Sequence, residues 1–362
     1  MIYYICFAIF LVEAFFCDVF TTRKIKKYEN LFYVFGCILL IMLAGIRVDT
    51  GYDFQSYKNI FEYVKMRNLE HIFAGGWSLV VESGYIFINY LFKFFPFRIF
   101  IFVISAISIL LKTTFINRYV EKKMLCLFLY YSMFYLLYDM GIIRQGLAVG
   151  ILLWAYDALI KENKIKFVGL VFLATLIHSS SFVFLIVYFI KDEKYSRKTY
   201  WIALFTAIGL SFIDMFVVLA RNIPSSFIQN KIAYYINSAN DDTIFNSIIK
   251  RLFVLLMIMF ILNLKKIEAN KPYIMRAFNS FYCSIILSIL FFKVPILGGR
   301  GTGSLQIMQL LILPICFEKK YIKDENVIYR LFYILFFGGF AFYSMYSLIN
   351  SHDYIPYKSM FG

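Results

Sequence analysis

The chain has 362 residues, of which 61% are hydrophobic, 21% aromatic and only 16% charged, and its formal net charge is +15. Apolar runs long enough to cross a bilayer, about 20 residues at 1.5 Å rise each, recur along its whole length and exclude a soluble globular protein. The runs are continuous and do not alternate as the strands of a membrane barrel do, so helices must satisfy the backbone hydrogen bonds. We therefore predict an all-α polytopic integral membrane protein.

Lysines and arginines lie between the apolar runs and do not gather in one basic domain. This spacing argues against nucleic acid as a partner and favours contact with anionic membrane lipids. The six cysteines lie inside or beside apolar runs and form no CxxC pair, so we expect buried thiols. The first apolar run lacks a basic n-region and a small-residue cleavage site, and we interpret it as a retained helix.

In chain order, the apolar runs lie near 2–20, 31–46, 79–95, 99–116, 124–138, 142–160, 165–190, 200–220, 248–264, 277–292, 303–317 and 327–349. Their number predicts about 10–12 transmembrane or re-entrant helices. The longest polar insertions, 47–78 and 221–247, are too short for an independent core, so we expect a single transmembrane domain over 1–362.

Five connecting loops carry eighteen lysines and arginines: 21–30, 161–166, 191–198, 265–276 and 318–323. The excess of basic residues in cytoplasmic loops places all five on the inner side and both long polar insertions on the outer side. One conflict concerns the run near 99–116, because basic residues flank it on both sides. We interpret 84–95 as a short or re-entrant helix for this reason.

The run at 165–190 has basic loops on both sides, so it must cross the membrane twice or not at all. Its midpoint, "FLATLIHSSSFVFL", contains the polar group His178-Ser179-Ser180-Ser181. We predict a tight hairpin with this group near the outer surface; the alternative is one long tilted helix with a buried histidine. The same reasoning predicts an outer turn in "YDMGIIRQGL", residues 138–147.

Two arginines are candidate anion ligands. Arg144 lies in "GIIRQGLAVG", at or near the start of a long apolar helix, and Gln145 follows it. A charged side chain at the membrane boundary is costly, so a functional role is the default hypothesis for Arg144. A guanidinium at a helix N-terminus suits the binding of phosphate or pyrophosphate. Arg300 lies in "KVPILGGRGTGSLQ", where the glycine-rich backbone can bind an anion with its N–H groups. The alternatives are snorkelling to headgroups for Arg144 and a plain turn for Arg300.

Candidate acid–base and sugar-binding groups come from three other segments. Asp53 and Tyr57 in "RVDTGYDFQSYKNIF" share a face if the segment is helical, and Arg47 precedes them. Glu82 in "VVESGY" faces the same site or forms a structural ion pair. His178 is a candidate general base, and Ser180 in the serine triplet a candidate substrate contact. Three scattered histidines without HExxH give no metal signature, and we expect no metal or cofactor.

Four motifs in this order, "GIRVDTGYDFQSYKNIF", "ESGYIFINYLF", "IRQGLAVGILLWAYDALI" and "FLATLIHSSSFVFL", closely resemble the EpsG-like branch of the Wzy-type polysaccharide polymerases. The motifs of the resemblance lie within roughly residues 30–190. The C-terminal half of the chain is similar only in its hydropathy and in one outer arginine, Arg300. It implies a large polytopic, GT-C-like glycosyltransferase of the bacterial inner membrane. Such enzymes join oligosaccharide repeat units carried on undecaprenyl pyrophosphate at the periplasmic face, into O-antigen, capsule or exopolysaccharide.

Carried onto this sequence, the resemblance implies that Arg144 and Arg300 hold the donor pyrophosphate. Asp53 or His178 then orients or deprotonates the acceptor hydroxyl. A chain-length-regulating co-polymerase is an implied partner. Related sequences often show Glu-Pro-Gly where this one has Glu82-Ser83-Gly84, so the fixed turn that proline imposes is not implied at this position.

Three other functions are compatible with the composition. A flippase or transporter predicts functional residues near the bilayer midplane and repeat symmetry between halves, and the sequence shows no repeat. A membrane acyltransferase predicts a histidine near the chain start, which His71 fits poorly. An O-antigen ligase uses similar residues and stays open as an alternative to the polymerase.

Overall fold

The computed structural model describes residues 1–19, 23–68, 81–213, 241–294, 297–322, 327–351 and 354–361. About 80% of it is helical, and the described residues form no strand, which confirms the predicted all-α fold. Among these residues, six segments are long and apolar enough to cross a membrane: Ile2–Val19, Phe97–Tyr119, Lys123–Gly141, Ile143–Ile160, Ile244–Ile261 and Pro272–Leu290. The chain is therefore an integral membrane protein. The other predicted runs fall on shorter or broken helices, or extend beyond the described residues.

The helices form two compact units. Unit 1 comprises Met1–Phe182 and Glu325–Gly362, and unit 2 comprises Val183–Asp324. The boundary falls inside one 3₁₀-helix, η4, which spans Ser179–Tyr188. The four motifs that carry the resemblance therefore lie in unit 1 up to Phe182, and Arg300 belongs to unit 2.

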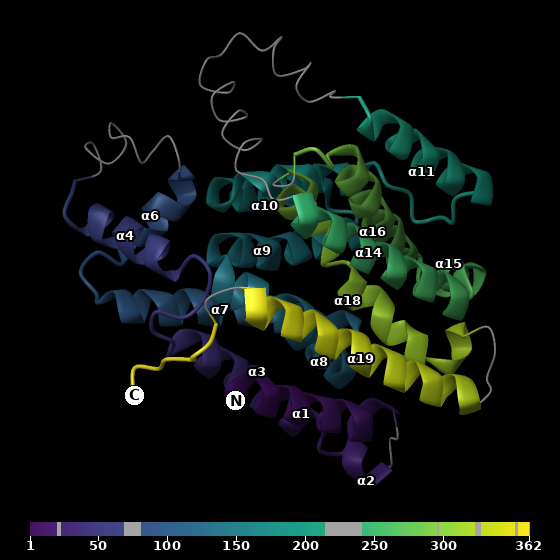
Figure 1. Cartoon of the computed structure of the whole chain (residues 1–362), viewed down its shortest axis with the longest axis horizontal. Helices are drawn as coiled ribbons and strands as arrows, with labels where there is room; N and C mark the ends of the chain where they lie inside the picture. The colour runs from purple at the N-terminus through teal and green to yellow at the C-terminus, as the bar shows by residue number, and fades with distance from the viewer. Residues whose placement is uncertain are drawn as a thin grey trace. The chain divides into compact units, whose positions relative to one another are not determined.

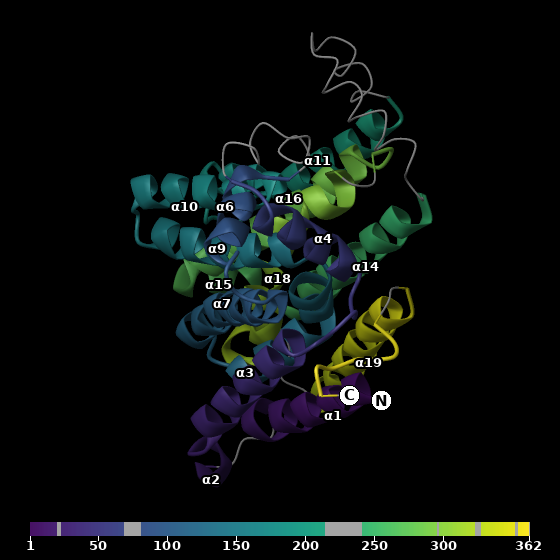
Figure 2. The same ribbon diagram turned by 90° about the vertical axis from the view of Figure 1, so that its left-hand side faces the viewer.

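Unit 1 contains the helices around the candidate site (Figure 1). They are α1 (Ile2–Ala14), the π-helix η1 (Phe15–Val19), α2 (Arg23–Lys26), α3 (Glu29–Gly45), α4 (Phe54–Lys65), α6 (Ser83–Leu91), α7 (Phe97–Tyr119), α8 (Lys123–Tyr130), the π-helix η3 (Tyr131–Gly141), α9 (Ile143–Ile160), α10 (Lys164–Ile177) and α19 (Val327–Ser351). Helix α9 packs between α7 and α10, and α3 packs against α7. Helix α19 lies beside α1, where the rings of Phe7 and Phe342 are 5.6 Å apart (Figure 2).

The connections of unit 1 gather at opposite ends of its helices. At one end, the Lys122 ammonium donates to the carbonyl of Asp18 over 2.6 Å, and the Lys161 ammonium lies 2.8 Å from the Asp157 carboxylate. The hydroxyl of Tyr119 donates to the same Asp157 carboxylate. The predicted inner loops 21–30 and 161–166 thus share this end with the end of α7. The segments that follow α3, η3 and α10 lie at the other end.

The helix breaks occur where polar residues interrupt the apolar runs. Helix α10 ends at Ile177, His178 is extended at φ −149° and ψ 114°, and η4 begins at Ser179. This break excludes the alternative of one long helix over 165–190. A second break at Ile142 separates η3 from α9, as the predicted outer turn in 138–147 requires. Helix α6 has nine residues, too few to cross a bilayer, which agrees with the short helix inferred for 84–95.

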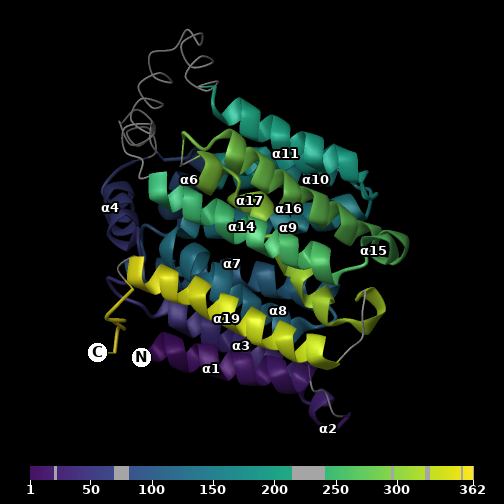
Figure 3. The same ribbon diagram turned by 45° about the vertical axis from the view of Figure 1, so that its right-hand side comes forward.

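Unit 2 consists of α11 (Arg197–Ser211), α14 (Asp241–Ile261), α15 (Leu264–Asn270), α16 (Pro272–Leu290), the π-helix η5 (Leu297–Gly301), α17 (Gly303–Gln306), α18 (Gln309–Ile312) and the 3₁₀-helices η6 (Leu313–Phe317) and η7 (Lys319–Tyr321). Helix α16 packs against α11 and α14 (Figure 3). The predicted inner loops of this unit also meet at one end: Arg276 pairs with Asp192 at 3.1 Å, and Lys271 pairs with Glu318 at 3.2 Å.

Two further predictions concern the cysteines and the long insertions. All six cysteines are free thiols and five are buried, as the sequence predicts. The first insertion, 47–78, contains the amphipathic helix α4, which buries Phe54, Tyr57 and Phe61 against its neighbours. Residues 69–78 of this insertion and 221–240 of the second lie outside the described residues.

Candidate functional site

The segment between α3 and α4 is held against the turn at the end of η3. Gly51 has a φ of +106°, which L side chains rarely adopt, and a Cβ there would overlap the carbonyl oxygen of Met140. Asp53 is the N-cap residue of α4 and Tyr57 lies one turn later. The Tyr57 hydroxyl donates to Asp53 Oδ2 over 3.4 Å. The predicted shared face of these two residues is therefore present, beside the start of α9.

Glu82 joins three of the motifs. Its Oε2 lies 2.6 Å from Nη1 of Arg144, which occupies the first turn of α9 as predicted. Its Oε1 accepts hydrogen bonds from the backbone N–H and the hydroxyl of Ser179, at 3.0 and 2.9 Å. Nδ1 of His178 is 3.8 Å from the same oxygen. The structural ion pair that the sequence left as one alternative for Glu82 is therefore present, and it lies inside the candidate site.

The charges in this cluster act on the Glu82 carboxyl. Burial alone raises its pKa, but Arg144, the backbone N–H of Ser179 and His178 outweigh burial and lower the pKa below the ordinary value of 4.5. The side chains of Glu82 and Arg144 are 17% and 21% exposed. Glu82 is thus an ionised carboxylate that accepts from its neighbours, a state that suits orienting other groups better than removing a proton.

Aromatic rings surround the Arg144 guanidinium. Its Cζ lies 5.7 Å from the ring centroid of Tyr85 and 6.0 Å from that of Tyr57, and the two rings pack edge to face. Such faces stabilise a cation and limit its side-chain freedom. Tyr85 is fully buried, and burial raises the pKa of its hydroxyl. Tyr85 lies on α6 one turn after Glu82 and was not among the residues predicted for the site.

Gly84 allows this cluster to form. A Cβ at Gly84 would lie 2.6 Å from the carbonyl oxygen of Leu176 at the end of α10. Helix α6 therefore approaches α10 with backbone against backbone, and this approach places Glu82 next to Ser179. The glycine of the Glu-Ser-Gly motif is thus required by packing, although no proline precedes it.

Three other predicted site residues lie deeper or elsewhere in unit 1. Arg47 is 2% exposed; its Nη1 donates to the carbonyl of Ala44 and its guanidinium lies 5.7 Å from the ring of Phe54. Gln145 is also buried, on the packed face of α9. Ser180 is partly exposed, and its neighbour Ser179 is the serine that bonds Glu82.

Arg300 lies in η5 of unit 2, in the glycine-rich segment that the sequence indicated. The structure adds Arg251 of α14, which is 2% exposed and contacts the same segment. Its Nη1 donates to the hydroxyl of Thr302 over 2.6 Å and to that of Ser288, and its Nη2 to the carbonyl of Gly299 over 3.5 Å. Arg251 therefore holds the turn that carries Arg300.

A family model described as the EpsG family matches residues 30–359. The chain belongs to the EpsG family. The matched range includes all four motifs of unit 1 and the Arg300 segment, so the match extends well beyond the residues that carry the resemblance in the sequence. Neither the curated proteins nor the solved structures give a match.

Membership in the EpsG family and the membrane-spanning helices assign this chain to the membrane-embedded, polymerase-type glycosyltransferases of polysaccharide biosynthesis. The function predicted from the sequence is confirmed at this level. The family also indicates lipid-linked oligosaccharides as substrates, with membrane lipids around the protein.

This EpsG-family chain also contains a buried ion pair that the sequence analysis did not single out. Lys112 of α7 and Asp139 of η3 are fully buried, and their Nζ and Oδ1 atoms are 2.7 Å apart. The hydroxyls of Ser108 and Tyr130 donate to the same carboxylate. The pair fixes η3 against α7 only four residues before the start of α9, and so determines where Arg144 lies.

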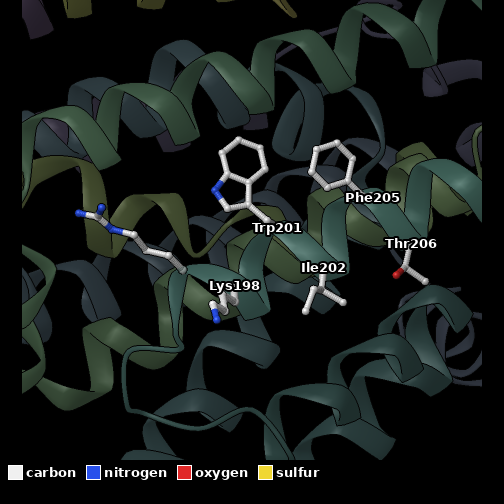
Figure 4. Close-up of a pocket in the computed structure, with 6 residues that line it drawn as sticks. Lys198, Trp201, Ile202, Phe205 and Thr206 are labelled. Atoms are coloured by element: carbon white, nitrogen blue, oxygen red, sulfur yellow. The ribbon is translucent and has the colours of Figure 1, made fainter.

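A shallow groove of about 570 Å³ on α11 has a different character (Figure 4). Arg197 and Lys198 line one part of it, and Trp201, Ile202 and Phe205 line the rest. Exposed apolar side chains with basic residues at the helix start are typical of a membrane helix near the lipid headgroups. Among the described residues, no group of three or more His, Cys, Asp and Glu side chains is placed to hold a metal ion.

Proposed function

We propose that this protein joins undecaprenyl-pyrophosphate-linked oligosaccharide repeat units into a polysaccharide at the outer face of the bacterial cytoplasmic membrane. The observation that carries the proposal is the cluster of Glu82, Arg144, His178 and Ser179. It brings together three of the four family motifs through direct contacts. The fourth motif adds Asp53 and Tyr57 beside it.

In the proposed reaction, a hydroxyl oxygen of the acceptor sugar attacks the anomeric carbon of the donor chain. A new glycosidic C–O bond forms while the anomeric C–O bond to the lipid pyrophosphate breaks, and its electron pair leaves with the pyrophosphate. Arg144 stabilises the charge that develops on this leaving group. The ion pair with Glu82 uses Nη1, one of three guanidinium nitrogens, and a phosphate oxygen binds another.

His178 takes the proton of the acceptor hydroxyl in this proposal. Glu82 lies beside its Nδ1 and orients the ring, so that Nε2 receives the proton and the imidazolium that forms is stabilised. Asp53 and Tyr57 bind the acceptor sugar through its other hydroxyls. Arg300 remains a predicted ligand of the lipid pyrophosphate. In this proposal the positive charge that stabilises the leaving group comes from cationic side chains of the protein and not from a metal ion.

The orientation is supported by the way unit 1 is built. The basic loops 21–30 and 161–166 lie at the end opposite the cluster, and the positive-inside rule assigns that end to the cytoplasm. A membrane-impermeant thiol reagent added to intact cells should label Tyr52→Cys, which is exposed at the cluster end. It should not label Lys161→Cys at the other end. Labelling in the reverse pattern would refute the orientation.

The enzymatic test uses purified protein in nanodiscs with lipid-linked repeat units, in the presence of a chelator. The expected product is a ladder of polymer with the wild type, and loss of the ladder with Arg144→Ala. Arg67→Ala is the matched control, because Arg67 is exposed just after the end of α4, where its Nη1 donates to the carbonyl of Tyr63 and its guanidinium lies over the Tyr63 ring. Transport of lipid-linked units without a ladder would indicate a flippase, and single transfer to a lipid core would indicate a ligase.

A further inference from the structure

The C-terminal tail of the chain, residues 354–361, lies against the segment that leads into Asp53. The backbone N–H of Val48 donates to the carbonyl of Lys358 over 2.9 Å, and that of Met360 donates to the carbonyl of Ile46 over 3.0 Å. Arg47 and Ser359 face each other in an antiparallel bridge between these bonds. The tail therefore supplies hydrogen-bond partners to a backbone that leaves α3 and has not yet entered α4.

Side chains extend this attachment. The Thr50 hydroxyl accepts from the backbone N–H of Lys358 over 3.1 Å and donates to the carbonyl of Val48. The Tyr357 hydroxyl donates to the carbonyl of Leu43 at the end of α3 over 3.0 Å. Thr50 has no exposed surface, so these bonds are shielded from water and are costly to leave unmade.

Tyr354 connects the tail with the turn before Arg144. Its side chain is fully buried, and its hydroxyl donates to the carbonyl of Leu136 in η3 over 2.7 Å. Its backbone carbonyl accepts from the Tyr3 hydroxyl over 3.0 Å. A Cβ at Gly141 would lie 2.5 Å from the Tyr354 hydroxyl oxygen, so the phenol fits directly against the last residue of η3.

The charged groups near Tyr354 are those of the candidate site. Burial raises the pKa of its hydroxyl, Arg47 opposes this effect, and Asp53 and Tyr57 add to it. The carboxylate and phenol assigned to the acceptor sugar therefore lie within electrostatic range of a residue about 300 positions later in the sequence.

We propose that the C-terminal tail is part of the acceptor side of the active site, and that Tyr354 is a positioning residue for Asp53. The role assigned to Asp53 rests on the proposed function. By bonding the 46–50 backbone on one side and η3 on the other, the tail fixes the distance between the Asp53–Tyr57 pair and the Glu82–Arg144 pair. Tyr354 acts through these contacts and takes no proton in the reaction.

The test compares four full-length or truncated proteins in nanodiscs: wild type, Tyr354→Phe, a chain ending at Ser351, and a chain ending at Met360. The last is the control, because it removes the exposed Phe361, whose backbone N–H donates to the Ser359 hydroxyl within the tail. Two quantities are measured on each: amide hydrogen exchange in peptides covering 46–60, and kcat and KM for a lipid-linked acceptor.

The chain ending at Ser351 should exchange amides in 46–60 about tenfold faster or more, because the segment loses its partners. Tyr354→Phe keeps the ring and loses only the hydroxyl. It should lower kcat about tenfold while KM for the acceptor changes less than about threefold, the pattern of lost positioning and retained binding. The chain ending at Met360 should match the wild type in both measurements.

Unchanged exchange in 46–60 after removal of the tail would overturn the proposal whatever the activity. Faster exchange with normal kcat in both variants would overturn the positioning role. If the wild type makes no polymer but exchange still separates the variants, the proposed function fails while the attachment of the tail to 46–50 is supported. These outcomes separate the two proposals, and the hydroxyl deletion covers the case in which the shorter chain does not fold.

Discussion

Removing either partner of the Glu82–Arg144 pair tests the candidate site most directly. We expect Glu82→Gln and Arg144→Gln each to lower the free energy of unfolding by about 2 kcal/mol. This lies between the values for exposed pairs, about 0.2–1 kcal/mol, and the cost of breaking fully buried ones, about 3–5 kcal/mol. The intermediate value follows because the two side chains are 17% and 21% exposed.

The double variant should cost less than the sum of the two single variants, by about 1–2 kcal/mol, since the second change removes a charge that the first has already left without its partner. The effect of pH gives a second signature. Because Arg144 helps to lower the pKa of Glu82, the pair stabilises the wild type fully above pH 4.5, the ordinary pKa, and loses this contribution as the pH falls through the lowered pKa. In Arg144→Gln the carboxyl keeps its burial without the cation, so its pKa rises and protonation occurs at higher pH.

Thermal unfolding of purified protein in nanodiscs measures these differences as shifts of a few degrees in Tm. Arg67→Gln makes the same chemical change at an exposed position just after α4, and it should shift Tm by less than the equivalent of about 0.5 kcal/mol. Single variants whose effects simply add, with a coupling below about 0.5 kcal/mol, would show that the pair does not form in the folded protein. The cluster on which the proposed function rests would then be refuted.

Three further predictions concern the residues that hold the site in place. Lys112→Met should destabilise the protein by about 3–5 kcal/mol, and adding Asp139→Leu should recover much of this loss, because a buried charge without its partner costs more than two apolar side chains. A double variant with the same Tm as Lys112→Met alone would contradict this. Gly84→Ala should lower polymer yield and Tm, because its Cβ meets the backbone of α10. At Gly169 a Cβ would have nothing within 4 Å, so Gly169→Ala should leave the yield unchanged and raise stability by up to about 1 kcal/mol. Equal effects of the two substitutions would refute the close approach of α6 and α10. Arg251→Met should make amide exchange in 297–302 faster, and Arg251→Lys should have a smaller effect. Equal exchange in the wild type and both variants would show that this arginine does not hold the turn.

Local composition was sufficient to predict the breaks that create the site. A histidine and three serines cannot continue an apolar helix as readily as the residues around them, and α10 indeed ends at Ile177. The turn before Arg144 was predictable from Asp139 and Gly141, which interrupt an apolar pattern. The sequence also placed Asp53 and Tyr57 on one face, because the offset of four residues gives that result in any helix.

The identity of the bonding serine was beyond such reasoning. Ser179, and not Ser180, contacts Glu82, because the chain is extended at His178 and then turns into a 3₁₀-helix. A change from 3.6 to 3.0 residues per turn rotates every following side chain. No local propensity specifies to within one residue where the helix type changes. The sequence could therefore indicate the serine triplet, but not which of its serines contacts Glu82.

Long-range pairs were the larger omission. Lys112 stands alone in "ISILLKTTF", and an ionisable residue inside an apolar run is a signal of a buried partner or a pathway. That signal could have been used, but its partner Asp139 lies in a π-helix, whose wider turn shifts the face on which each residue points. Tyr354 gave even less indication, since its contacts with Leu136 and Tyr3 depend on how α19 returns the chain to the beginning of unit 1.

These omissions have a common physical origin that bears on how the site works. Arg144 and Glu82 carry charges that the family motifs display in the sequence, but neither can hold its own position at the end of a helix in a membrane. Lys112–Asp139 fixes η3 against α7, Gly84 sets α6 against α10, and the tail fixes the 46–50 segment against η3. Each of these contacts joins segments far apart in the sequence and uses residues that perform no chemistry. A site whose charges must meet a diphosphate and a sugar at fixed distances depends on such contacts for its rate, so substitutions at Lys112, Gly84 and Tyr354 should lower kcat although none of the three touches substrate in the proposed reaction.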